Sequence, residues 1–219
     1  MIPPERLPAD VLMLLWPGGL YGLNSVSRSV LSQGAGAVVG AVSGRDQSSD
    51  VRPLIGMTSL GSSTLKYMVH LKPEIEARGF ELAVFHTTGL GGRAMESLAR
   101  KGAFAAVMDF SLVEVSDHLF ESPISAGADR LEGAGSAGVP QIVAPGGVTL
   151  VDLATWKEVP EQFADREFHI HNRFIACAKF NVEERVAAAK VIAKKLMTAK
   201  GPTVFIMPLR GIDEWDKED

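Results

Sequence analysis

Two junctions between a predicted strand and a predicted helix carry the residues best suited to chemistry. Each has a short apolar run, then glycine and hydroxyl residues, then an amphipathic helix, and the two span residues 54–64 and 82–92. In parallel α/β sheets, helix N–H groups and small hydroxyls converge where a strand ends, and they bind anions there. The sequence therefore predicts a small anionic ligand that carries phosphate. The residues expected around it are Gly61, Ser62, Ser63, Thr88, Gly89, Gly91 and Gly92.

The two glycine turns follow neither of the standard nucleotide motifs. No lysine comes after Gly61 in the order of a P-loop. A dinucleotide fingerprint has three glycines at fixed spacing, and after Gly89 the third of them is absent. This disfavours NAD as the ligand. The alternative for both turns is an ordinary strand-to-helix connection whose hydroxyl residues cap a helix.

Four ionisable residues are candidates for contacts with this ligand. Arg93 would add a permanent cation in the first turn of a helix, and Lys179 would add a second. His86, at a strand end, is a candidate catalytic acid or base, and the alternative is a histidine bonded to neighbouring backbone. Asp109 ends a third strand, a position suited to catalysis, to Mg²⁺ or to a ligand hydroxyl. Glu114, soon after it, is assigned to a solvated loop or a helix cap.

Other reactive residue types stand in weaker patterns. His169 and His171 stand two positions apart and would share a face on a strand, but two histidines without a third nearby ligand do not define a metal site, so none is predicted. Cys177 lies in an apolar context and is expected to be a small core residue. Arg130 begins a predicted helix and is expected to pair with a ligand anion or with Glu132. No Gly-x-Ser-x-Gly elbow of a hydrolase is present.

Composition and charge narrow the classes of function. The chain has 219 residues, a net charge of −4 and no lysine/arginine block, so nucleic acid is not expected as a ligand. No apolar run reaches the length of a membrane span, and the first residues lack the pattern of a secretory signal. The single cysteine cannot form an internal disulfide, which fits a reducing compartment. A cytoplasmic protein that does not bind membranes is therefore expected.

The alternation of apolar strands and amphipathic helices predicts an α/β fold, a Rossmann-like and mostly parallel sheet with helices on both faces. Residues 1–45 are assigned to an N-terminal segment with a strand at 11–16 and a Gly/Ala-rich helix at 23–42, residues 46–52 to a linker, and residues 53–219 to the α/β subdomain. Strands are predicted at 54–57, 81–86, 105–110, 141–144, 174–178 and 203–207. Helices are predicted at 64–78, 92–101, 113–119, 129–137 and 182–199. Residues 151–164 are predicted to be irregular.

Several segments, in chain order, are shared with a known family. The most specific are His-x-Thr-Gly-x-Gly-Gly from His86 and Ser-Ala-Gly-x-x-Arg-Leu from Ser125, and they are followed by segments at 138–141, 145–146, 171–172 and 208–211. Over nearly its whole length the chain resembles the Tm-one-like ATP-binding family, which is related to the tomato mosaic virus resistance protein.

The resemblance implies a protein of two α/β subdomains, of which this chain is the second. An N-terminal subdomain is then missing here, and residues 1–45 resemble the segment that ends it. The family implies ATP as the ligand, with Mg²⁺ as a possible companion. Much of the ATP binding in the family belongs to the first subdomain.

Three functions are consistent with these observations. The first is binding of a nucleotide or another phosphorylated small molecule at the glycine-rich sheet edge. The second is a metabolic enzyme that acts on a phosphorylated or carboxylated metabolite, and the sequence leaves open whether any reaction is catalysed. The third is an interaction module that forms homo-oligomers through the Gly/Ala-rich helix at 23–42, since small residues permit close packing.

Overall fold

The computed structural model describes residues 22–44 and 52–209, and these ranges belong to two separate compact units. The first range is mainly one helix, α1 (Ser25–Ser43). Asn24 begins it with a capping box, in which its side chain accepts hydrogen bonds from the N–H groups of Val26 and Ser27. None of the residues of α1 is buried. The predicted strand at 11–16 and nearly all of the predicted linker lie outside the described residues, so the domain boundaries stay a prediction.

The second unit is built on a five-stranded parallel sheet with the strand order β2-β1-β3-β4-β8. Its strands are β1 (Leu54–Ser59), β2 (Glu81–His86), β3 (Ala106–Asp109), β4 (Gln141–Val143) and β8 (Thr203–Phe205). The chain moves outward from β1 to β2 and then returns to β3 on the other side of β1. The order therefore reverses between β1 and β3, which is the switch point at which doubly wound sheets bind ligands. The predicted Rossmann-like α/β fold is confirmed.

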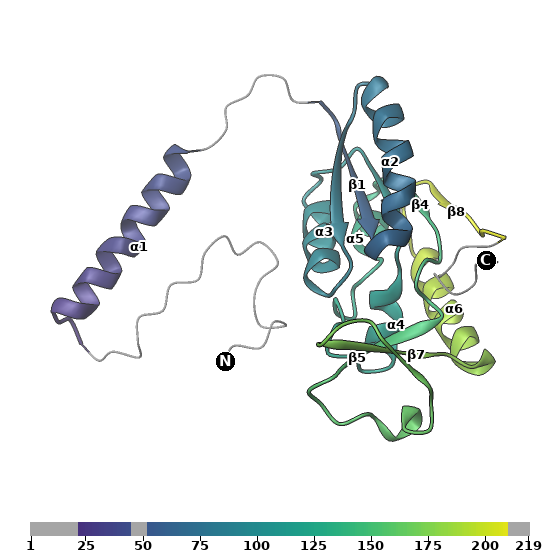
Figure 1. The fold of residues 1–219 in the computed structure, drawn as a ribbon. Helices are drawn as coiled ribbons and strands as arrows, with labels where there is room; N and C mark the ends of the chain where they lie inside the picture. The colour runs from purple at the N-terminus through teal and green to yellow at the C-terminus, as the bar shows by residue number, and fades with distance from the viewer. Residues whose placement is uncertain (1–21, 45–51, 210–219) are drawn as a thin grey trace. The chain divides into compact units, whose positions relative to one another are not determined.

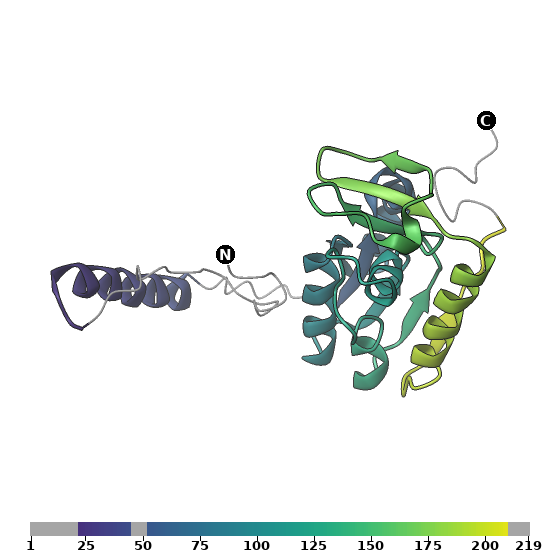
Figure 2. The same ribbon diagram turned by 90° about the horizontal axis from the view of Figure 1, so that it is seen from below.

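Helices cover both faces of this sheet (Figure 1). They are α2 (Gly61–Ala77), α3 (Leu90–Arg100), α4 (Val113–Leu119), α5 (Gly133–Ala137) and α6 (Val182–Leu196). Figure 2 shows α3, α5 and α6 side by side on one face, whereas α2 lies on the other. Right-handed crossovers produce this arrangement, because the single step from β1 to β2 runs opposite to all later steps. Within residues 22–44 and 52–209, no helix combines the length and hydropathy that a membrane span needs.

A second, antiparallel sheet was not predicted from the sequence. Its strands are β5 (Leu150–Ala154), β6 (Phe168–Ile170) and β7 (Ile175–Lys179), in the order β5-β7-β6, with the short 3₁₀ helix η2 (Glu161–Phe163) between β5 and β6. The irregular segment predicted at 151–164 is therefore wrong for its first residues, which form β5. In Figure 1, β5 and β7 lie beside α4, beyond the end of β1. The second sheet thus packs against the carboxyl edge of the parallel sheet.

The helix predicted at 129–137 is wrong in its first half, because only Gly133–Ala137 is helical. Leu131 has a φ of 72°, in the left-handed region that a helix excludes. The Glu96 carboxylate holds this turn, since it accepts hydrogen bonds from the N–H groups of Leu131 and Gly133. A contact with a distant helix therefore overrides the local helical propensity.

Apolar residues on both sheets form the core. Met95, Phe104, Val107 and Val139 pack between α3 and the parallel sheet, and a second cluster joins α4, β4 and α6. Under the antiparallel sheet lie Val151, Leu153, Phe163, Ala178 and Phe180. The apolar clusters under both sheets hold the loops at the carboxyl edge of the parallel sheet, where predicted site residues lie.

Candidate functional site

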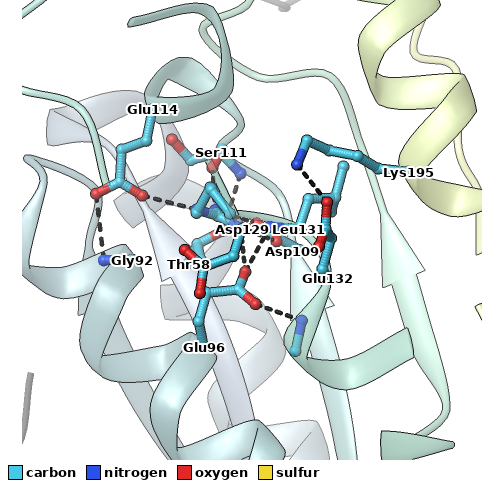
Figure 3. A network of polar contacts seen from close by, with 12 residues as sticks. Thr58, Gly92, Glu96, Asp109, Ser111, Glu114, Asp129, Leu131, Glu132 and Lys195 are labelled. Atoms are coloured by element: carbon cyan, nitrogen blue, oxygen red, sulfur yellow. Dashed lines mark hydrogen bonds and ion pairs between the residues drawn. The ribbon is translucent and has the colours of Figure 1, made fainter. Parts of the chain in front are cut away.

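The glycine turn before α3 holds an anion that belongs to the protein itself. The N–H groups of Gly89 and Gly92 donate to Glu114 Oε1 at 2.7 and 3.2 Å. Glu114 comes from α4 and is fully buried (Figure 3). A carboxylate at a helix N-terminus is stabilised by the helix dipole and by the N–H groups that the first turn leaves open. In this structure the carboxylate of Glu114 therefore occupies the glycine turn, and binding of an external anion there stays a prediction.

The glycines of this turn are also required by packing. A Cβ atom on Gly92 would lie 1.8 Å from Glu114 Oε2, and one on Gly91 would lie 1.9 Å from the carbonyl oxygen of His86. Gly89 has a φ of 92°, which strains any other residue. Glycine at these three positions follows from the internal contacts, and an external ligand is not needed to explain it.

Arg130 joins Glu114 to two more buried carboxylates. Its Nε donates to Glu114 Oε2 at 2.8 Å, its Nη1 to Glu96 Oε1 at 3.1 Å, and its two terminal nitrogens bind Asp109 in a bidentate pair at 2.5 and 2.8 Å. Arg130 Nη2 also donates to the carbonyl oxygen of Ser111. Figure 3 shows Glu96, Asp109 and Glu114 converging from α3, β3 and α4. We call Arg130 and these three carboxylates the Arg130 network.

In the Arg130 network, burial and charge pairing shift the pKa values of Arg130 and Glu96 in opposite directions. Burial alone would lower the pKa of Arg130, but Asp109, Glu114 and Glu96 hold it well above its usual value. Burial raises the pKa of Glu96 even though Arg130 acts to lower it. A charged arginine facing three carboxylates fixes the relative positions of the elements that surround the switch point.

The structure places the predicted site residue Asp109 inside this network. Asp109 is buried, Arg130 binds both of its oxygens, and Thr58 Oγ1 donates to Oδ1 at 2.8 Å. A Mg²⁺ ion on this carboxylate would face the guanidinium cation at close range. Asp109 therefore does not fit as a ligand of Mg²⁺, and its contacts are those of a group that holds β3 to β1 and to Arg130.

Other predicted site residues lie on an open rim at the ends of β1 and β2. His86 and Thr88 are exposed, and Gly61 is exposed at the start of α2. His86 Nδ1 lies 3.1 Å from the carbonyl oxygen of Ser59, so it is the nitrogen that carries the proton and Nε2 points elsewhere. Ser59 and His86 are partners in the register of the two strands. Gly61 and Thr88, each two residues further on, therefore follow neighbouring strand ends.

The remaining predicted residues lie on several elements. Arg93 is half-buried in the first turn of α3. Lys179 is exposed at the end of β7, in the second sheet, where it pairs in register with Leu150. Ser62 and Ser63 lie in the first turn of α2. Asp109 and the glycines at 89, 91 and 92 thus meet in the protein interior, whereas His86, Thr88 and Gly61 share the rim.

The crevice at the switch point is filled by side chains. Leu60, which follows β1, packs with Val113, Leu150, Cys177 and Ile175 from α4 and the second sheet. Leu112 N–H donates to the carbonyl oxygen of Gly146, which ties the loop after β4 to the loop after β3. The exposed residues of this edge, Gly61, His86 and Thr88, lie on the β1–β2 side of the switch point.

A second buried polar cluster lies between α4 and β5. Asp117 Oδ1 accepts a hydrogen bond from Asp152 N–H at 2.8 Å, and the Cys177 thiol donates to Asp152 Oδ1 at 3.1 Å. Burial raises the pKa of Asp117 well above its usual value, and the charge of Asp152 adds to this effect. Burial likewise raises the pKa of Asp152. Cys177 is a buried core residue, as predicted. Across the described ranges, no three His, Cys, Asp or Glu residues group as metal ligands do.

Sequence reasoning missed the Arg130 network because its charged residues look like surface residues. Glu96 lies in an amphipathic helix, and Glu114 follows a strand end where acidic caps are common. The nearest available signal was Arg130 in the segment Ser-Ala-Gly-x-x-Arg-Leu, together with Asp109 at the end of β3 and Glu114 at the start of α4. The sequence does not show that these residues meet, because they are separated by many positions along the chain.

Fold and site together define a doubly wound α/β domain whose glycine-rich anion turn is closed by an internal carboxylate. Residues 52–219 match the family model described as the Uncharacterised protein family (UPF0261) C-terminal domain. The chain therefore belongs to this family.

Three relatives show how much of a longer protein the chain represents. A UPF0261 protein of Brucella melitensis is 54% identical over 217 residues, which are 99% of this chain and 52% of the relative. A UPF0261 protein of Clostridium tetani is 37% identical over 95% of this chain and 52% of its own length. The ToMV resistance protein Tm-1(GCR237) of Solanum lycopersicum is 30% identical over 93% of this chain and 28% of its own length. The resemblance to the Tm-one-like family is confirmed, and the chain spans about half the length of the bacterial relatives.

Proposed function

We propose that this domain binds a nucleotide such as ATP, or another phosphorylated small molecule, on the open rim at the ends of β1 and β2. In this proposal a phosphate group lies against the first turn of α2. The observation that carries the proposal is the difference between the first turns of α2 and α3. The first turn of α3 is closed by Glu114, whereas α2 begins after the apolar residue Leu60, whose side chain cannot cap it.

The start of α2 has the backbone geometry that a phosphate requires. Gly61 has a φ of 52°, and no atom lies within 4 Å of the position that a Cβ would take. A ligand oxygen can therefore approach the backbone N–H groups closely. The helix is 17 residues long, so its dipole at this end is fully developed.

Groups on the next strand complete the proposed contact surface. Thr88 offers a hydroxyl, and His86 keeps Nε2 available while Nδ1 donates to Ser59. Arg93 and Lys179 would supply positive charge, Lys179 from the second sheet, whose residue Leu150 packs with Leu60. Mg²⁺ would enter with the phosphates of the ligand rather than through Asp109.

The relatives suggest how the site is completed. Because the bacterial relatives are about twice as long as this chain, we propose that the segment they have before the matched region forms an N-terminal subdomain that covers the nucleotide. We also propose a cytoplasmic location, in keeping with a single buried thiol. A catalytic role for His86 would require turnover of a phosphorylated metabolite that is lost in His86→Ala.

The proposal is tested by a thermal-shift titration with ATP, ADP, inorganic phosphate and a carboxylate control, with and without Mg²⁺. A ligand that binds only the folded state raises the melting temperature with concentration. We expect a rise with ATP that is reduced in Gly61→Ala, because the methyl group blocks the approach to the backbone.

Gly79→Ala is the matched control. Gly79 also has a positive φ, 82°, and open space at the Cβ position, but it follows the other end of α2. The two variants should lose similar intrinsic stability. An equal response of both variants to ATP would refute the proposed position of the phosphate. No rise with any phosphate compound, in this chain and in a form that includes the preceding segment, would refute the binding function.

A second candidate function, self-association through α1, is favoured by a specific observation. Leu31, Val38, Val39 and Val42 are each 62–69% exposed in a helix that has no buried residue. Four apolar side chains exposed on one helix are typical of an interface. Light scattering should give a dimer or larger species that becomes monomeric in Val38→Glu, whereas Gln33→Glu, on the opposite face of the same helix, should leave the mass unchanged. A monomeric mass for the unaltered chain at high concentration would contradict this function.

A further inference from the structure

A cavity of about 420 Å³ opens between α4, the loop at 127–132 and α6. It shares none of the residues of the rim at β1 and β2. Its volume falls within the range of pockets that hold small organic ligands. Part of its wall is apolar, formed by Val115 and Leu119 of α4 and Val191 of α6.

The polar part of this wall is mainly basic. His118, Lys194 and Lys195 line the cavity, against the single carboxylate of Glu132. Arg130 also lies in the wall, but it pairs with the three carboxylates of the Arg130 network and adds no positive charge to the cavity. Two lysines against one carboxylate leave the exposed polar part of the wall with a net positive charge, in a chain whose overall net charge is −4.

Internal contacts hold several of these groups in place. Lys195 Nζ pairs with Glu132 Oε1 at 2.7 Å and also donates to the carbonyl oxygen of Ala128 (Figure 3). His118 Nδ1 lies 3.1 Å from Ser125 Oγ, which also accepts a hydrogen bond from Gly127 N–H. Lys194, next to Lys195 on α6, is exposed. A preformed wall of this kind loses little conformational entropy when a ligand binds.

We propose that this cavity is a binding site for a small organic anion. The apolar body of the ligand packs against Val115, Leu119 and Val191, and its acidic group faces Lys194 and Lys195, with His118 at the side. The pairing of an apolar wall with basic residues favours a ligand that carries both features over inorganic phosphate alone. Since the cavity and the rim at β1 and β2 have no residue in common, this proposal does not depend on the nucleotide site.

The test is a titration of the ¹⁵N-labelled chain with phenyl phosphate, followed by amide chemical shifts. Inorganic phosphate supplies the charge without the apolar body, and phenol supplies the body without the charge. We expect saturable shifts at Gly127, Ala128 and Lys195 with phenyl phosphate, and weaker binding of both controls. The shifts of Gly61 and Thr88 report separately on the rim, so the two proposals succeed or fail independently.

Two variants on the same helix provide the decisive comparison. Lys194→Ala removes a charged hydrogen-bond donor from the cavity, and binding of phenyl phosphate should weaken about tenfold. Lys190→Ala removes an equally exposed lysine that does not line the cavity, and its affinity should be unchanged. Alanine is a good helix former, so both variants should keep the fold, which their amide spectra verify. Equal affinities in the two variants, or no saturable shift at 127–128, would overturn the proposal.

Discussion

Replacing Arg130 by methionine should destabilise the domain more than any change of a surface charge. Arg130 makes five hydrogen bonds, to Glu96, Asp109, Glu114 and the carbonyl oxygen of Ser111. Methionine fills a similar space but leaves three buried carboxylates without their cation. Breaking a buried ion pair in this way costs about 3–5 kcal/mol. For a domain of this size that corresponds to a fall in melting temperature of roughly 6–20 °C.

The pH dependence of this loss distinguishes lost charge pairing from lost packing. Burial already raises the pKa of Glu96 in the folded state, and the variant removes the charge of Arg130 that acts to lower it, so this pKa should rise further. A group with a raised folded-state pKa contributes stability below its unfolded pKa and loses it as pH rises through the folded pKa. The gap between the natural chain and Arg130→Met should therefore widen from pH 5 to pH 8.

Urea unfolding at several pH values measures this gap, and Arg100→Met is the matched control. Arg100 lies at the margin of the same network, where it pairs with Asp129 at 2.6 Å, but its side chain is 38% exposed. Exposed pairs contribute about 0–1 kcal/mol. A loss in Arg130→Met no larger than that in Arg100→Met, or a gap that does not change with pH, would show that the network does not stabilise the fold as argued.

Three further predictions concern stability. Asp117→Asn keeps the acceptor for Asp152 N–H and removes a carboxyl whose pKa is raised by burial. The stability of the variant relative to the natural chain should therefore grow by about 1.4 kcal/mol per pH unit above about pH 4, until the folded-state pKa of Asp117 is passed. Urea titrations at pH 4.5 and 7.5 that give the same difference in unfolding free energy between the two proteins would contradict this. Gly92→Ala should lower the free energy of unfolding by more than about 2 kcal/mol, because the new Cβ meets Glu114. Gly36→Ala has open space in α1 and should be neutral or slightly stabilising. Melting followed by circular dichroism measures both effects. Asn181→Ala should lose about 1 kcal/mol in urea unfolding, since Asn181 accepts the N–H of Glu184 in the capping box of α6, and Asn181→Ser should restore most of it.

Local patterns were enough to predict most of the parallel sheet and its helices. The bounds predicted for β2 at 81–86 and for α4 at 113–119 are those of the structure, and Asn181 begins α6 as expected. The helix α6 shows the reason most clearly, because its apolar residues recur at helical spacing and Asn181 marks its beginning.

The second sheet and the filling of the switch point could not be predicted in the same way. The strands β5, β6 and β7 have three to five residues each, and their pairing joins segments on either side of a long loop. The strand β7 was predicted, at 174–178, whereas the runs that form β5 and β6 did not distinguish a strand from a loop. The glycine turn at 89–92 was recognised as an anion site, but the nearby carboxylate that fills it comes from a helix that the sequence describes as solvated.

The contact of Glu114 with the first turn of α3 has a consequence for competition between ligands. A carboxylate that is part of the same chain acts at an effective concentration of millimolar or higher, because its position next to the turn is already fixed. A free anion would have to displace it and would also separate Glu114 from Arg130. We therefore expect occupancy of this turn to follow the folding of α4 rather than the phosphate concentration of the solution.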